Sequence, residues 1–75
     1  MLLKDAETIV NFLEQQDSNT IFTLLEVMHI LHITTQQPIQ LHLRVITLIE
    51  RHQKIQLCFL PSYELPYKVP FTIKR

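Results

Sequence analysis

The sequence predicts an α+β domain in which three helices are followed by two β-strands. Apolar residues first recur every three or four positions, which is the spacing of one face of a helix. This spacing covers three segments, about 5–16, 24–32 and 36–52. The pattern then changes to alternation over 54–60 and 67–73, which is typical of strands that bury one face. We therefore expect residues 1–75 to form a single domain that ends in a two-stranded hairpin.

Polar residues mark the ends of the first two helices. Asp5 is expected to cap the first helix, because its side chain can accept from a free backbone N–H. Thr23 and Glu26 have the spacing of a capping box and predict the start of the second helix. The chain contains no glycine, so Asn19 is expected to take the left-handed conformation that ends the first helix. Residues 20–22 are β-prone and are expected to pair briefly as a strand.

The third predicted helix carries a narrow polar stripe. Four polar residues fall in a sector of roughly 60° at 100° per residue, namely Gln40, Arg44, Thr47 and Arg51. Nearly all other positions are apolar, so Ile39, Leu43 and Ile46 are expected to lie in the core. A threonine of the preceding turn is expected to cap the helix, with Pro38 in its first turn. The stripe fits a helix that enters a DNA groove, and it fits an ordinary solvated face equally well.

The alternating segments predict which residues of the hairpin face the core. Leu57 and Phe59 are expected to point inward, and Cys58 is expected to point outward or toward a partner. Pro70 cannot donate a hydrogen bond to a neighbouring strand. The return strand is therefore expected to be an edge strand, or to be bulged at Pro70.

Acidic and basic residues are segregated along the chain, although the net charge is zero. Residues 1–33 hold one lysine and five acidic residues, a net charge of −4, whereas residues 34–75 hold six basic and two acidic residues, a net charge of +4. The C-terminal half can therefore present a positive face to an anion such as DNA.

The order of helix, short strand, helix, turn, helix and hairpin resembles the winged helix-turn-helix family over nearly the whole chain. Residues 23–34, TLLEVMHILHIT, look like the second helix of that family, and residues 48–55, LIERHQKI, look like the end of its recognition helix running into the wing. The chain departs from the family at His32 and Gln53, where members often have glycine. The resemblance implies a sequence-specific, DNA-binding transcriptional regulator that acts as a dimer.

The candidate DNA-binding residues lie on the third helix and beside it. They are Gln37, Gln40, Arg44, Thr47, Arg51, Lys54 and Lys68. Glutamine can pair with adenine, arginine with guanine, and threonine can touch a thymine methyl. The lysines, together with Lys74 and Arg75, are candidates for phosphate contacts that position the domain without reading sequence.

A protein-binding role is the alternative function. The tip of the predicted wing lacks the Lys or Arg that such wings set against phosphate, and it is apolar instead. The candidate residues of a protein interface are Leu60, Tyr63 and Leu65, because aromatic side chains are favoured at interfaces. In this interpretation the winged helix is an adaptor or a subunit of a complex, and it does not bind DNA.

Other functions have little support in the sequence. No Ser-His-Asp order, paired catalytic carboxylates or glycine-rich phosphate loop is present, so we expect no enzyme activity, no catalytic residue and no cofactor. His29 and His32 share a helix face without a third ligand, and two solvated histidines are favoured over a metal site. One cysteine, no long apolar run and no signal peptide predict a cytoplasmic protein outside the membrane. No small-molecule site is evident.

Overall fold

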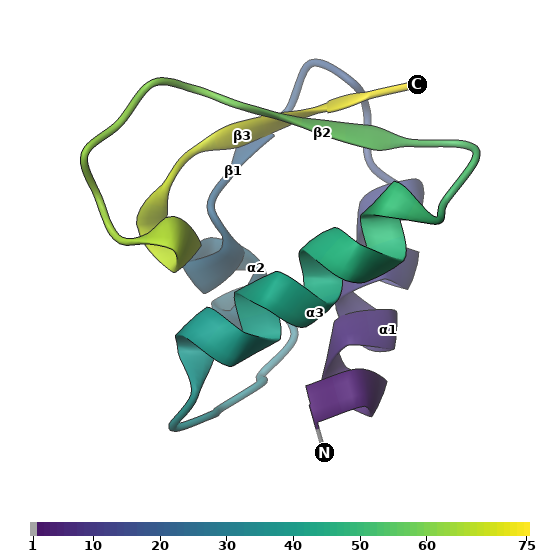
Figure 1. Ribbon diagram of the computed structural model, residues 1–75. Coiled ribbons are helices and arrows are strands. Elements are labelled where there is room, and N and C mark those ends of the chain that lie inside the picture. The colour runs from purple at the N-terminus through teal and green to yellow at the C-terminus, as the bar shows by residue number, and fades with distance from the viewer. Residues whose placement is uncertain (1) are drawn as a thin grey trace.

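The protein has an α+β fold, as the sequence predicts. The computed structural model describes residues 2–75 (Figure 1). The elements are α1 (Leu2–Glu14), β1 (Ile21–Phe22), α2 (Leu24–Ile30), α3 (Pro38–Glu50), β2 (Gln56–Phe59), the short 3-10 helix η1 (Pro66–Lys68) and β3 (Phe71–Lys74). Across the described residues these form three α-helices and one antiparallel sheet of three strands.

The sheet has the strand order β1-β3-β2, so the last strand of the chain lies in the middle. β3 pairs with β2 in the register Cys58↔Thr72 and Phe59↔Phe71, and it pairs with the two residues of β1 on its other side. In Figure 1 the strands cross above the helices, and α3 runs diagonally beneath them. The short strand expected at residues 20–22 is confirmed as β1.

The core lies where α1 and α3 pack together beneath the sheet. Its largest fully buried side chains come from every layer: Ile9, Leu13, Val27, Leu41, Val45, Ile55, Phe71 and Ile73. No polar or charged residue among residues 3–75 is buried with them. The core is therefore held by apolar packing alone.

A chain of aromatic rings crosses this core. The ring centroids of Phe12 and Phe22 are 5.7 Å apart, those of Phe22 and Phe71 are 6.5 Å apart, and those of Phe71 and Phe59 are 5.5 Å apart. The chain ends at the His42 ring, 5.7 Å from Phe59 and close to edge-on. Edge contacts of this kind are the favoured geometry for aromatic pairs.

One predicted helix cap is confirmed and two are wrong. The Thr23 hydroxyl accepts a hydrogen bond from the Glu26 N–H at 3.1 Å, as an N-cap should. Asp5 lies inside the first turn of α1, because that helix already begins at Leu2. The N-cap of α3 is Gln37, which has no side-chain capping bond; the Thr35 hydroxyl accepts from the Gln37 N–H at 3.0 Å and stabilises the turn before the helix.

The left-handed residue of the domain is His32, and the expectation for Asn19 is wrong. Among residues 2–75, His32 is the only one with a positive φ, of 57°. The N–H of His32 donates to the carbonyl of His29, and that of Ile33 donates to the carbonyl of Met28 at 2.9 Å. These two bonds make a Schellman motif, which satisfies carbonyls at the end of α2. His32 therefore holds the position where the winged-helix resemblance leads one to expect glycine.

Replacing His32 with glycine is expected to stabilise the domain. A left-handed conformation costs a residue with a Cβ about 1–2 kcal/mol. Glycine avoids this cost, but its unfolded chain has more conformational freedom to lose on folding, which offsets part of the gain. We expect the free energy of unfolding in urea to rise by up to about 1 kcal/mol. His29→Gly, inside the same helix, should instead lower it by a few tenths of a kcal/mol. A loss of stability for His32→Gly would contradict the motif.

The hairpin is shorter than predicted. The strands cover 56–59 and 71–74. The second strand starts later than expected because Pro66 opens a 3-10 turn that includes Tyr67. Pro70 lies just before β3, where its missing N–H does not interrupt the hydrogen bonds between strands. The Pro70 carbonyl accepts a hydrogen bond from the Leu60 N–H at 2.9 Å. β3 pairs with β1 on one side and with β2 on the other in an unbroken register, so it is a central strand, and the expectation of an edge strand or a bulge is wrong.

Candidate functional site

The four side chains of the polar stripe are exposed as predicted, three of them on α3 and that of Arg51 at the C-cap of the helix. Leu41, Val45 and Ile49 of the same helix are buried on the opposite side, against α1 and the sheet. Within residues 2–75, all four residues on the side of α3 that carries the stripe are exposed. Gln40, Arg44, Thr47 and Arg51 therefore share one accessible surface, which we call the α3 face.

The α3 face is less polar than the sequence suggests. Ile39 and Leu43 are 46% and 58% exposed, and Ile46 is half-buried. The expectation that these three residues lie in the core is wrong, because the core covers only one side of the helix. Gln40, Leu43, Arg44 and Thr47 line a shallow hollow of about 300 Å³, so an apolar side chain sits among the polar ones.

The guanidinium groups of the α3 face are free to bind a ligand. Within residues 2–75, Arg44 and Arg51 form no ion pair, and no hydrogen bond ties either side chain to the rest of the domain. The Thr47 hydroxyl already donates its hydrogen bond to the Leu43 carbonyl, at 2.9 Å, and is not a donor for a ligand. The hydrogen-bond donors that the face offers therefore come mainly from Arg44, Arg51 and the Gln40 amide.

The remaining DNA-binding candidates lie around α3 rather than in one cluster. Gln37 is exposed at its N-terminal end. Lys54 is exposed in the turn that leads from α3 to β2, and Lys68 is exposed at the end of η1, which packs on α2 and α3. In Figure 1, η1 lies beside the first half of α3, whereas the turn holding Lys54 lies beyond its other end. The two lysines thus flank the helix from opposite ends.

Arg75 is tied to the C-terminal end of α1. Its Nη2 donates to the carbonyl of Glu14 at 2.6 Å and also to that of Gln16. This contact is favourable, because carbonyls left free at the end of a helix are strong acceptors for a cation. A phosphate contact at Arg75 stays a prediction and would have to use the other nitrogen atoms of the guanidinium group.

His52 fastens the C-terminal end of α3 to α1. Its Nε2 lies 3.1 Å from a Glu14 carboxylate oxygen, and its Nδ1 accepts from the Lys54 N–H at 3.1 Å. This arrangement suits an imidazole with its proton on Nε2, which donates on one side and accepts on the other. The turn after α3, and with it Lys54, is held in place by this residue.

The loop after β2 exposes the residues expected at a protein interface. Leu60 and Leu65 are 40% and 48% exposed, and Tyr63 is fully exposed. Beside this loop, His42 and Phe59 line a hollow of about 400 Å³. Burial lowers the pKa of His42, because desolvation penalises the imidazolium form.

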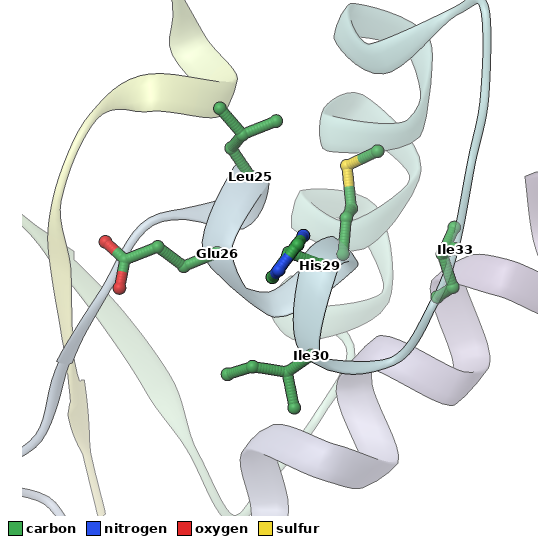
Figure 2. A pocket seen from close by; sticks show the side chains of 6 residues that line it. Leu25, Glu26, His29, Ile30 and Ile33 are labelled. Atoms are coloured by element: carbon green, nitrogen blue, oxygen red, sulfur yellow. The ribbon is translucent and has the colours of Figure 1, made fainter.

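A larger apolar hollow lies on α2, where the sequence analysis identified no site. It has a volume of about 640 Å³ and is lined by Leu25, Met28, Ile30, Ile33, Glu26 and His29. Figure 2 shows Leu25, His29 and Ile30 on α2 and Ile33 on the segment that follows. Leu25 and Ile30 are 44% and 49% exposed. Their position off the buried face of the second helix was the signal for this surface.

The described residues offer no metal centre. Residues 2–75 contain no group of three His, Cys, Asp or Glu side chains that could hold a metal ion, and His29 and His32 are both exposed. In the same part of the chain, every helix is too short or too polar to span a membrane. No protein-family model, curated protein or solved structure matches this chain.

Proposed function

We propose that the protein is a winged helix-turn-helix domain and a cytoplasmic, DNA-binding regulator of transcription. The order of elements supports this assignment: α2 and α3 form the helix-turn-helix, and β2 and β3 with their loop form the wing. The strand order β1-β3-β2 is compatible with it. The observation that carries the function is the α3 face, where two guanidinium groups are exposed and form no ion pair within residues 2–75.

The proposed mode of binding sets α3 into the major groove. Arg44 and Arg51 are suited to guanine edges or phosphates and Gln40 to an adenine edge. Lys54 and Lys68, at opposite ends of the helix, are suited to phosphates on either side of the groove. Leu43, exposed beside Thr47, is also suited to apolar contact with a thymine methyl.

The test is a titration of duplex DNA at low and moderate salt, with wild type and Arg44→Ala/Arg51→Ala. The double variant should fold normally, because both side chains are exposed. Each lost phosphate contact should reduce the slope of log K against log salt by about 0.9, and each lost base contact should cost roughly 1–3 kcal/mol of discrimination. Lys4→Ala, a charge removed from α1, is the control and should leave binding nearly unchanged. Absence of salt-dependent binding by the wild type would exclude the DNA-binding function.

A second candidate function is protein binding, and the α2 hollow favours it. Zero net charge and a wing tip without basic residues also fit this function better than DNA binding. If the wild type does not bind DNA, a protein that copurifies with it and rebinds after purification should be sought. Loss of rebinding on Ile30→Asp or Tyr63→Asp would show whether the α2 hollow or the loop is the docking surface.

A further inference from the structure

β2 is an edge strand, and no other strand of residues 2–75 pairs with its outer side. The Leu60 N–H donates to the Pro70 carbonyl, so these two residues form a hydrogen-bonded pair. Hydrogen-bonded and non-hydrogen-bonded pairs alternate along an antiparallel ladder. In the register of β2 with β3, the next hydrogen-bonded pair is therefore that of Cys58 with Thr72. Leu57 and Phe59 occupy the intervening pairs. Their N–H and C=O groups therefore point away from β3, toward the free edge.

A hollow lies directly beside this free edge. It has a volume of about 410 Å³, and it is lined by residues of α3, β2 and the turn between them, without any residue of β3. Its apolar walls are Ile46 and Ile49 from α3 and Leu57 and Phe59 from β2. Leu57 and Phe59 are paired with the buried residues Ile73 and Phe71, so they lie on the face of the sheet that packs on the helices. A strand added at the edge would set its own inward side chains over this hollow.

The edge lacks the features that usually block strand addition. Exposed edges are commonly protected by a charged residue or a proline, and Gln56, Leu57, Cys58 and Phe59 include neither. The flanking charges are of opposite sign, since Lys54 precedes the strand and Glu64 follows it. Antiparallel pairing of two identical strands brings the basic end of one toward the acidic end of the other. This charge complementarity favours a second copy of the chain as the occupant.

We propose that the protein forms a two-fold symmetric dimer by antiparallel pairing of β2 with β2 of a second copy. One register uses all the outward backbone groups of the strand: Leu57 pairs with the second copy's Phe59, and Phe59 pairs with its Leu57. Each Phe59 ring then lies over the hollow of the other chain. A six-stranded sheet results, and the contact is isologous, as two-fold symmetry requires.

The same register brings the two Cys58 residues face to face. They form the central pair without direct hydrogen bonds, in which the Cα atoms lie about 4.5 Å apart. A disulfide requires Cα atoms about 4.4–6.8 Å apart. Cys58 is exposed on the outer face of the sheet, so it can report the register without disturbing the core.

The test is oxidation of the native full-length protein with diamide, followed by non-reducing electrophoresis. Diamide takes up the two hydrogen atoms that the thiols lose as the S–S bond forms. We expect the wild type to shift to twice its 8.9 kDa mass, and Cys58→Ser to remain a monomer. The matched control is Gln56→Cys/Cys58→Ser, which moves the thiol along the same face of the same strand. In the proposed register its two thiols are offset by four residues, about 13 Å, and it should not cross-link.

A further variant and a mass measurement complete the test. Adding Leu60→Cys to that control places residue 60 opposite residue 56 of the second copy, and cross-linking should return. Without oxidant, sedimentation equilibrium in reductant should show the dimer forming as concentration rises, and Cys58→Lys should suppress it by opposing two like charges. Equal cross-linking at residues 56 and 58, or a wild type that stays at 8.9 kDa at every concentration, would overturn the proposal. Neither result depends on DNA binding, because the α3 face is not part of this contact.

Discussion

Replacing Phe71 with alanine is expected to lower the free energy of unfolding by about 3–5 kcal/mol. Phe71 is only 2% exposed, lies in the central strand and contacts the rings of Phe22 and Phe59. Removing its ring leaves a cavity beside Phe22 and Phe59, which these neighbours cannot fill without moving. A domain of this size has a total stability on the order of 4–11 kcal/mol, so the variant should be partly or largely unfolded at moderate temperature.

Urea denaturation followed by circular dichroism measures this loss. Phe59→Ala is the matched control, because it removes the same side chain from the neighbouring edge position, where it is 39% exposed. Its cost should be clearly smaller, since less apolar surface is exposed to water by the change. Both measurements belong at low protein concentration, where association does not contribute. Equal losses for the two variants would mean that β2 is covered in the monomer and that its edge is not free.

Replacing Leu41 with alanine is expected to destabilise the domain by about 2–5 kcal/mol. Leu41 is fully buried, whereas Leu43, two positions further along the same helix, is 58% exposed. The two substitutions remove the same atoms and make the same change in helix propensity. Their difference therefore isolates the burial of the side chain and with it the facing of α3.

Leu43→Ala should change the free energy of unfolding by no more than about 0.5 kcal/mol. Chemical denaturation of both variants, compared by their midpoints at unchanged slope, gives the result. If Leu43→Ala proved the more damaging, α3 would be rotated relative to the arrangement described above. The α3 face would then be buried and could not bind DNA.

Local signals in the sequence predict most of the helical part of this fold. Thr23 caps α2 because the bond to the Glu26 N–H needs only neighbouring residues, and the exposure of Arg44 and Arg51 follows from helical periodicity. The hairpin was predicted less well. Phe59 alternates with outward residues as a core residue would, but its burial depends on the strand order, which periodicity does not encode. β3 lies between β1 and β2, and Phe59 is left at an edge.

Long-range contacts explain the other differences. Arg75 reaches carbonyls at the end of α1, about sixty positions earlier in the chain, and its basic side chain alone gives no sign of this partner. The α2 hollow is lined by Leu25 and Ile30, which are only about half covered by the rest of the domain. An apolar residue off the main face of a helix indicates an exposed apolar surface, but whether that surface forms a hollow depends on the neighbouring elements.

Burial of His42 at the end of the chain of aromatic rings makes the stability of the domain sensitive to acid. Because burial lowers the pKa of His42 from 6.5, the unfolded chain takes up a proton at this residue more readily than the folded domain does. Above pH 6.5 this residue therefore does not reduce the free energy of unfolding. Below pH 6.5 that free energy declines, until the folded residue is itself protonated. The His42 ring packs on Phe59 at the outer end of the ring chain. Acidification is therefore expected to lower the free energy of unfolding through this half-buried imidazole, as urea denaturation at a series of pH values would show.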